Sequence, residues 1–397
     1  MESKKYLLTN ACIYDARHRY ETVNIVVCDD TIKAIASPAL LTPDSFCGAV
    51  VIDLTGYTVL PGIIDSHVHV AVDPKGFTDA ALTAWVRNGV TTVRDLGMLI
   101  KAPCEEYASW LNSKQGPEYA RVISAGQYID VEGGYGCGPN PEERVGIIIK
   151  TPEEAANAVS REHAAGFPVI KIGIQDKPLP GSNGPAKPRL TADEVKAIAD
   201  RVHEHGMRLT SHLQLSETLD WIIDLGIDDA AHTPHDRMPE ALIAKVVHHS
   251  IPMVTTIGDP DFKLPPFVPE DKHALIYAAM AQDRAGIASN LRRIRDAGGL
   301  IAYGTDTMKC EDYEAQACIR VSEFQQLADV GFTLDELVRI ATINPATVLG
   351  IEDEEGSIEV GKRANLIAVK GKLDDALQCL SDVRFVMNRG TIVTNRL

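Results

Sequence analysis

Apolar and polar positions alternate in two different ways along the chain. Near the start, short apolar stretches are separated by polar turns, which predicts strands at residues 6–14, 23–28, 31–35 and 50–54. From Ile63 onward, apolar runs of strand length alternate with amphipathic stretches, which indicates repeated βα units. After Asn344-Pro345 the short-strand pattern returns, at residues 356–359, 365–369, 383–387 and 391–394.

The βα region predicts an α/β fold with a parallel sheet. Its eight apolar runs are at residues 63–69, 91–95, 121–125, 169–174, 208–212, 229–232, 252–256 and 301–305. Eight such units are typical of a (β/α)₈ TIM barrel, which we expect over residues 59–345. Residues 1–58 and 346–397 each offer too few strands to close a core, so we expect both chain ends to build one small β-sandwich domain.

Three long loops rich in Gly and Pro follow predicted strands, at residues 130–144, 176–189 and 258–272. In a barrel, loops of this kind line the mouth at the carboxyl ends of the strands, where chemistry takes place. We therefore expect these loops to surround a functional site.

Composition narrows the class of protein. No apolar run of the 397 residues approaches the roughly 20 residues needed to span a bilayer, and no secretory signal is visible, so a cytoplasmic location is expected. Eight cysteines without a CxxC pair favour reduced thiols. The net charge of −16 opposes binding to nucleic acid or an anionic membrane. We expect a small-molecule substrate and a homo-oligomer.

Two histidines one residue apart, His67 and His69, are the strongest sign of chemistry. In a strand, residues i and i+2 share a face, so both rings can reach one metal ion. The alternative is a surface strand with two solvated histidines. Apolar residues on both faces, including Ile63, Ile64 and Val68, favour a buried parallel strand and hence the metal site.

Four later strands carry a polar residue at or near their carboxyl ends: Lys171, His212, His232 and Asp306. Imidazole and carboxylate ligands without thiolates suit zinc, manganese, iron, cobalt or nickel, and zinc is the default expectation. An ammonium on the apolar strand of Lys171 must be neutralised. Burial lowers a lysine pKa, and a neutral amine can add carbon dioxide to form a carbamate that bridges two cations. The alternative is an ion pair of Lys171 with Asp306.

These residues, in this order, resemble the metal-dependent amidohydrolase superfamily. The resemblance rests on LPGIIDSHVH (residues 60–69), GVTTVRD (89–95) and GSIEVGKRANL (356–366), and so covers nearly the whole chain. Within the superfamily the chain looks most like the group of prolidase-type dipeptidases and imidazolonepropionase-related hydrolases, with VIKI (169–172) as the strand-four signature.

The resemblance implies a binuclear metal centre. By resemblance, His67 and His69 bind a buried ion, His212 and His232 a more exposed one, and Lys171 bridges them as N6-carboxylysine. Asp306 would bind metal and act as the catalytic proton shuttle. A hydroxide held between two divalent cations is ionised near neutral pH, and one cation can polarise a substrate carbonyl.

Two further residues are candidates for substrate binding. Related dipeptidases often carry Gly-Gly-His-Gly after strand three, whereas this chain has Gly133-Gly134-Tyr135-Gly136, so dipeptide specificity does not transfer directly. Tyr135 could hydrogen-bond a substrate group or simply pack, and His235 could face the mouth or be a solvated loop residue.

The sequence therefore predicts hydrolysis of an amide-type C–N bond, in a dipeptide, an N-acyl amino acid or a cyclic amide. The alternatives are hydrolysis of a lactone, carbamate or phosphoester by the same site. A deaminase fits less well, because Leu213, Gln214 and Leu215 follow His212 where deaminases of the superfamily usually carry a glutamate. A noncatalytic scaffold is disfavoured because all six ligand positions are kept.

Overall fold

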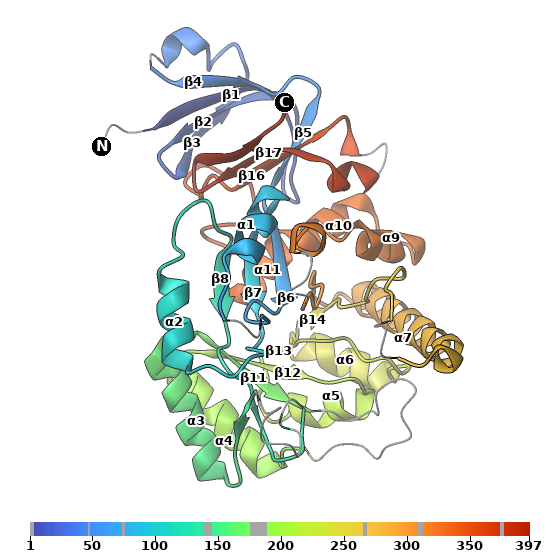
Figure 1. Cartoon of the computed structure of the whole chain (residues 1–397). Helices are drawn as coiled ribbons and strands as arrows, with labels where there is room; N and C mark the ends of the chain where they lie inside the picture. Colours follow the sequence, from blue (N-terminus) through green and yellow to red (C-terminus); the bar gives the residue numbers. More distant parts are fainter. Residues whose placement is uncertain are drawn as a thin grey trace.

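Three β-sheets and the helices around them make up the computed structural model of the chain (Figure 1). It describes residues 4–46, 48–73, 76–135, 137, 145–174, 189–264, 268–308, 313–373 and 377–397. One sheet is formed by the two ends of the chain, and the other two are parallel sheets built from the middle of the chain.

The two ends of the chain share an eight-stranded sheet of order β18-β17-β16-β5-β1-β2-β3, with β4 paired to β1. Its strands are β1 (Lys5–Tyr14), β2 (Arg19–Cys28), β3 (Thr31–Ala36), β4 (Val50–Asp53), β5 (Tyr57–Pro61), β16 (Leu366–Lys370), β17 (Val383–Asn388) and β18 (Thr391–Asn395). Strand β16 runs antiparallel to β5, from the pair Leu366 and Pro61 to the pair Lys370 and Tyr57. Two 3₁₀ helices, η1 (Pro43–Ser45) and η4 (Leu377–Ser381), lie in its connections.

The expected strand at residues 356–359 is wrong. These residues form bends and a loop, in which the backbone N–H of Ile358 donates to the Asp15 carboxylate. The apolar Ile358 is buried among polar neighbours, so the local pattern imitates the alternation of a strand. Strand β5, which was not predicted, leads through Pro61 and Gly62 directly into the strand that carries His67.

The middle of the chain forms two parallel sheets. The three-stranded sheet contains β6 (Ile63–Val68), β7 (Val90–Asp95) and β8 (Arg121–Ser124). The seven-stranded sheet has the order β10 (Ile147–Ile148), β9 (Ile129–Asp130), β11 (Val169–Gly173), β12 (Arg208–His212), β13 (Asp229–Ala230), β14 (Met253–Val254) and β15 (Ile301–Ala302). Each of the eight predicted strands overlaps one of these strands: β7 begins one residue before its predicted start, and several others are shorter than predicted.

Backbone hydrogen bonds connect the two parallel sheets on one side. Ser66 N donates to Tyr303 O at 2.8 Å, and His69 N donates to Thr307 O at 2.8 Å, so β6 runs beside the chain that follows β15. Among the described residues, no ladder joins β8 to the seven-stranded sheet. The structure thus shows the expected α/β arrangement as two parallel sheets rather than one continuous closed ladder.

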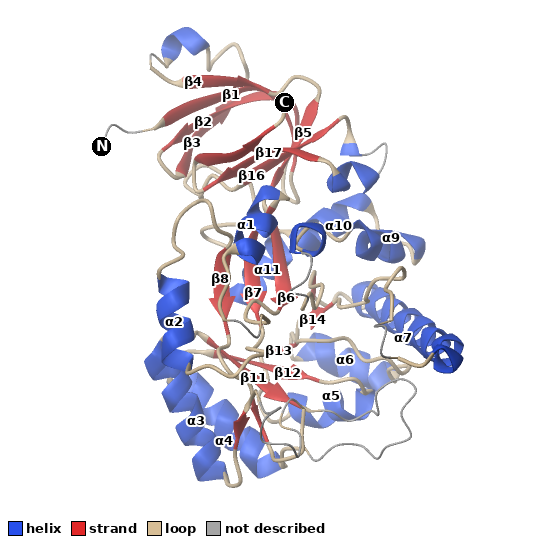
Figure 2. Ribbon diagram, viewed as in Figure 1, coloured by secondary structure: helices blue, strands red, loops and turns tan. Residues whose placement is uncertain are grey.

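Helices lie around the outside of the parallel strands (Figure 2). They are α1 (Ala80–Arg87), α2 (Cys104–Asn112), α3 (Pro152–Ala165), α4 (Ala192–Glu204), α5 (Ser216–Ile223), α6 (Glu240–His248), α7 (Glu270–Asp296), α8 (Tyr313–Gln316), α9 (Val321–Asp329), α10 (Leu334–Ala341) and α11 (Ile343–Leu349). Capping boxes at Thr191 and Thr333 fix the starts of α4 and α10. Within the described chain, no helix has both the length and the apolar character to cross a membrane.

Two expectations concern segments that are only partly described. In the predicted mouth loops, residues 136, 138–144 and 176–188 lie outside the described residues. The loop at 258–272 is described apart from residues 265–267. The cysteines within the described ranges are free thiols: Cys12, Cys28, Cys104, Cys137, Cys318 and Cys379.

Candidate metal centre and active site

The structure brings the six predicted ligands into one cluster. His67 lies in β6 and Lys171 in β11, His212 ends β12, and the other three follow the ends of β6, β13 and β15. The carboxyl ends of parallel strands meet at one edge, which explains why residues far apart in the sequence converge there. Lys171 Nζ lies 3.1 Å from His67 Nε2. The nearest ring nitrogens of His212 and His232 are 2.9 Å apart.

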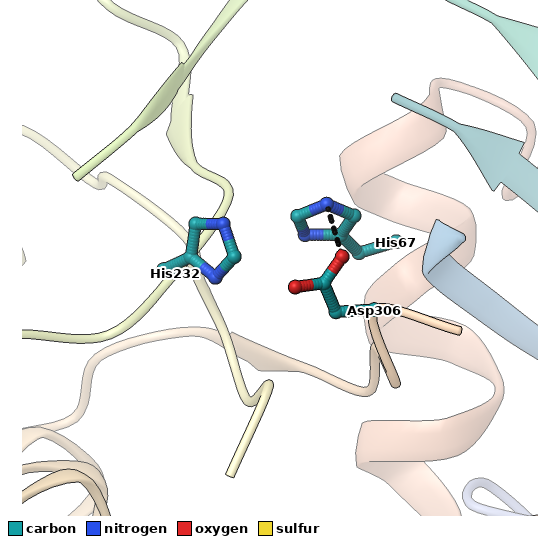
Figure 3. A group of neighbouring side chains, drawn as sticks. All are labelled: His67, His232 and Asp306. Carbon is teal, nitrogen blue, oxygen red and sulfur yellow. Dashed lines mark ion pairs between the residues drawn. The ribbon is translucent and has the colours of Figure 1, made fainter. Parts of the chain in front are cut away.

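Asp306 lies at the centre of this cluster. One of its carboxylate oxygens is 3.3 Å from His67 Nε2 and 3.2 Å from His69 Nε2. Figure 3 shows the carboxylate of Asp306 pointing into the space between the rings of His67 and His232. Ligand atoms of these three residues all lie within 4.8 Å of one another, a spacing at which one cation could be held.

The imidazoles are oriented by hydrogen bonds from their outer nitrogens. The Nδ1–H of His67 donates to Ala231 O at 2.9 Å, and the Nδ1–H of His69 donates to Gly97 O at 2.7 Å. His232 Nδ1 lies 3.1 Å from the Thr256 hydroxyl. These bonds fix the tautomer in which Nε2 of His67 and His69 carries a lone pair directed at the cluster. The donor set therefore fits a divalent metal ion.

Burial gives these groups the protonation states that a metal requires. Burial, reinforced by the positive charge of Lys171, lowers the pKa of His67 well below its ordinary value. Burial and the neighbouring His212 lower the pKa of His232 in the same way. Neutral imidazoles are the form that binds metal.

Lys171 and Asp306 respond to burial in opposite ways. Burial lowers the pKa of Lys171 to about 8, so a neutral amine is accessible near neutral pH. Burial alone would raise the pKa of Asp306, but the close approach of His69 and the positive charge of Lys171 outweigh it, and the pKa is lowered. Asp306 is therefore a carboxylate at neutral pH.

The backbone at Asp306 is held in an uncommon conformation by its neighbours. Its φ of 52° lies in the left-handed region, which costs a residue other than glycine about 1–3 kcal/mol. On one side, the N–H and hydroxyl of Thr305 donate to Asp65 at 3.1 and 2.7 Å. On the other side, the Arg320 guanidinium donates to the Thr307 hydroxyl at 3.2 Å. Sequence reasoning missed these supports, although an acid at position 65 within an apolar run was a usable signal.

A buried ion pair between neighbouring strands supports the site. Arg94 donates to both carboxylate oxygens of Asp229, at 2.8 and 2.9 Å, and its Nε donates to Ser66 O at 2.7 Å. Both side chains are almost fully buried. This bidentate pair ties β7 to β13 and to the residue before His67, and it was not predicted from the sequence.

The two predicted substrate-binding residues lie in different places. The Tyr135 ring stacks on His212 with centroids 3.9 Å apart, and Lys171 Nζ is 5.9 Å from the centre of the same ring. His235 lines a cavity of about 400 Å³ that also reaches His212, His232 and Asp306. His235 Nδ1 lies 3.2 Å from a carboxylate oxygen of Asp283. Tyr135 thus packs against the ligand cluster, and His235 lies in the wall of the adjoining cavity.

Comparison with known proteins identifies the family. The model of the amidohydrolase family matches residues 58–394. An uncharacterized protein of Mycobacterium tuberculosis is 24% identical, over 74% of this chain and 75% of that protein. An imidazolonepropionase of Alkaliphilus metalliredigens is 23% identical, over 88% of this chain and 84% of that protein. The crystal structure of a Xaa-Pro dipeptidase with bound methionine has a TM-score of 0.80 at 24% identity, covering 98% of this chain and 99% of that one. The chain belongs to the amidohydrolase family and is a hydrolase acting on C–N bonds.

Proposed function

We propose that this chain is a metal-dependent hydrolase that cleaves an amide-type C–N bond in a small molecule, such as a dipeptide, an N-acyl amino acid or a cyclic amide. The observation that carries the proposal is the buried cluster in which Lys171 and Asp306 both approach His67 Nε2, at 3.1 and 3.3 Å. The named activities of the imidazolonepropionase and the Xaa-Pro dipeptidase agree with this class of bond.

The metal centre that we propose uses six residues and two divalent ions, with zinc as the default. Its ligands are His67, His69, Lys171, His212, His232 and Asp306. Lys171 would act as N6-carboxylysine and bridge the ions. Its pKa of about 8 supports this role, because only the neutral amine adds carbon dioxide.

The chemistry is divided between the metal and the protein. A divalent metal, when bound, makes water a better nucleophile near neutral pH and polarises a carbonyl. Asp306, already ionised, accepts a proton and returns it to the leaving nitrogen. The hydrogen bonds of Thr305 and Thr307 keep the carboxylate of Asp306 directed at the reacting atoms. Tyr135 and His235 contact the substrate in this proposal.

The scaffold that we propose for this site has two parts. The two parallel sheets close as a (β/α)₈ barrel over residues 59–345, which the bonds between β6 and the chain after β15 support. Residues 1–58 and 346–397 form a β-sandwich domain, which the pairing of β16 with β5 supports. The eight-stranded sheet contains β5, and β5 leads into β6, which carries His67 and is followed by His69.

A metal analysis combined with a substrate panel tests the proposal. Protein purified with divalent metal and bicarbonate should hold two ions per chain and hydrolyse N-acyl amino acids, dipeptides or cyclic amides. Lys171→Ala should lose at least one ion and most of its activity, whereas Lys33→Ala, at an exposed position of β3, should keep both. Two ions and full activity in Lys171→Ala would exclude the bridging role. Turnover confined to lactones or phosphoesters would exclude the C–N bond as the substrate.

A further inference from the structure

One face of the long helix α7 forms a wall of the cavity beside the metal centre. Met280, Asp283, Arg284 and Ile287 line the cavity, at the spacing i, i+3, i+4 and i+7 that places residues on one helix face. Gly286 lets this helix approach the backbone of His235 closely, because a Cβ at position 286 would lie 1.9 Å from the His235 carbonyl oxygen. In Figure 1 this helix flanks the parallel strands on the side of α6.

Four polar side chains that line this cavity lie in two close pairs. His235 Nδ1 is 3.2 Å from the Asp283 carboxylate, and Arg320 Nη1 is 3.0 Å from the Asp259 carboxylate. Asp306 faces the histidines of the ligand cluster. The carboxylates of Asp283, Asp259 and Asp306 therefore each have a close neighbour within the protein.

Arg284 differs from the other charged residues of the cavity. Throughout the described parts of the chain, it has no ion-pair or hydrogen-bond partner. The positions three and four residues away on either side carry Met280, Ala281, Ile287 and Ala288, none of them acidic. By contrast, Arg293 on the same helix pairs with Glu240 at 2.6 Å. Arg284 thus presents an uncompensated guanidinium to the cavity.

We propose that Arg284 is a specificity-determining residue that binds a carboxylate of the substrate outside the amide group that is cleaved. A guanidinium binds a carboxylate with two parallel hydrogen bonds, which gives both affinity and orientation. The apolar Ile257, Met280 and Ile287 line the same cavity. The preferred substrate is then an amide that combines an acidic group with an aliphatic one. The inference rests on the proposed function and names its substrate class.

Matched substrate pairs measure this preference. N-acetyl-leucine and N-(3-methylbutyl)acetamide share one scissile amide and differ by a carboxylate on the amine side. N-isobutylsuccinamic acid carries a carboxylate where N-isobutylbutanamide carries a methyl group, on the acyl side of the amide. The wild type should favour the acid in at least one pair. In Arg284→Met the ratio of kcat/KM for acid over neutral substrate should fall about 10- to 100-fold, as expected for a hydrogen-bonded charge, mainly through KM.

Other substitutions on α7 make this test specific. Arg292→Met removes an exposed arginine of the same helix that does not line the cavity, so it should leave the ratio unchanged. Arg284→Lys should retain part of the preference, and Arg284→Glu should reverse it. An acid-to-neutral ratio in Arg284→Met equal to that of the wild type would overturn the inference while leaving amide hydrolysis intact.

Binding measured without turnover separates this inference from the proposed function. Calorimetry should detect 4-methylpentanoate binding to the metal-loaded wild type, with about 10-fold weaker binding to Arg284→Met. If no amide is hydrolysed but this difference is present, the proposed function fails and the carboxylate site stands. Equal binding by wild type and Arg284→Met would overturn the carboxylate site.

Discussion

Replacing Lys171 by methionine should stabilise the metal-free protein although it removes a proposed ligand. Lys171 is fully buried on β11, where its side chain approaches the His67 ring. Methionine has a similar length and shape, so it keeps the packing while removing the charge. In the absence of metal and carbon dioxide, the wild type must place an ammonium in the interior, and the variant need not.

The pKa of Lys171 gives the size of the effect. Its fall from 10.5 to about 8 corresponds to about 3 kcal/mol, since one pKa unit is worth about 1.4 kcal/mol. Between these values the unfolded chain binds more protons than the folded one, so wild-type stability rises with pH. The advantage of Lys171→Met should therefore be about 3 kcal/mol at pH 7, fall to about 1 kcal/mol at pH 9.5, and disappear above pH 10.5.

Urea unfolding of chelator-treated protein in carbon-dioxide-free buffer measures this advantage at both pH values. Lys33→Met on the exposed side of β3 serves as the control and should change stability by no more than about 0.5 kcal/mol. If Lys171→Met is as stable as the wild type or less stable at pH 7, the burial argument for the lowered pKa of Lys171 is wrong. A gap that does not narrow at pH 9.5 would show that the gain comes from packing instead of charge.

Three other substitutions or deletions test the site and its scaffold. With metal content held equal, Asp306→Asn should lower kcat at least about 10²-fold, as expected for loss of a general base. Binding of a substrate-like inhibitor should weaken less than kcat falls. A near-normal kcat would show that Asp306 does not transfer the proton. Thr307→Val removes the acceptor of the Arg320 hydrogen bond and should lower kcat about 10-fold without loss of metal, and an unchanged rate would show that Asp306 needs no such support. A chain ending at Leu349 lacks β16, β17 and β18 and should be insoluble or poor in metal. Solubility and metal content equal to those of the full chain would contradict this prediction.

The cluster could be predicted from sequence because each of its residues lies within an apolar run or close to its end. His67 and Lys171 interrupt runs that are otherwise buried, and a buried polar residue needs a reason to be there. Because the carboxyl ends of parallel strands meet at one edge, the residues at these ends are brought close together. No distance information was needed for this step.

The supports of the cluster could not be predicted, because they depend on which strands lie side by side. Arg94 and Asp229 are far apart in the sequence, and nothing local indicates that they pair. Strand ends were also misjudged. The predicted strand at residues 252–256 forms a ladder only at Met253–Val254. Thr256 has a φ of 37°, which departs from strand geometry, although its N–H still donates to Gly304 O.

The pairing of β5 with β16 has a consequence for how the protein is made on the ribosome. Strand β5 precedes β16 by about 300 residues, and at about 5–20 residues per second it waits roughly 15–60 s for that partner. During this time β5 presents one unpaired edge, while the βα units that follow are already emerging. Contacts between such distant segments also form slowly once the chain is complete. Growth temperature and chaperone supply should therefore affect the yield of active enzyme more strongly than its final stability.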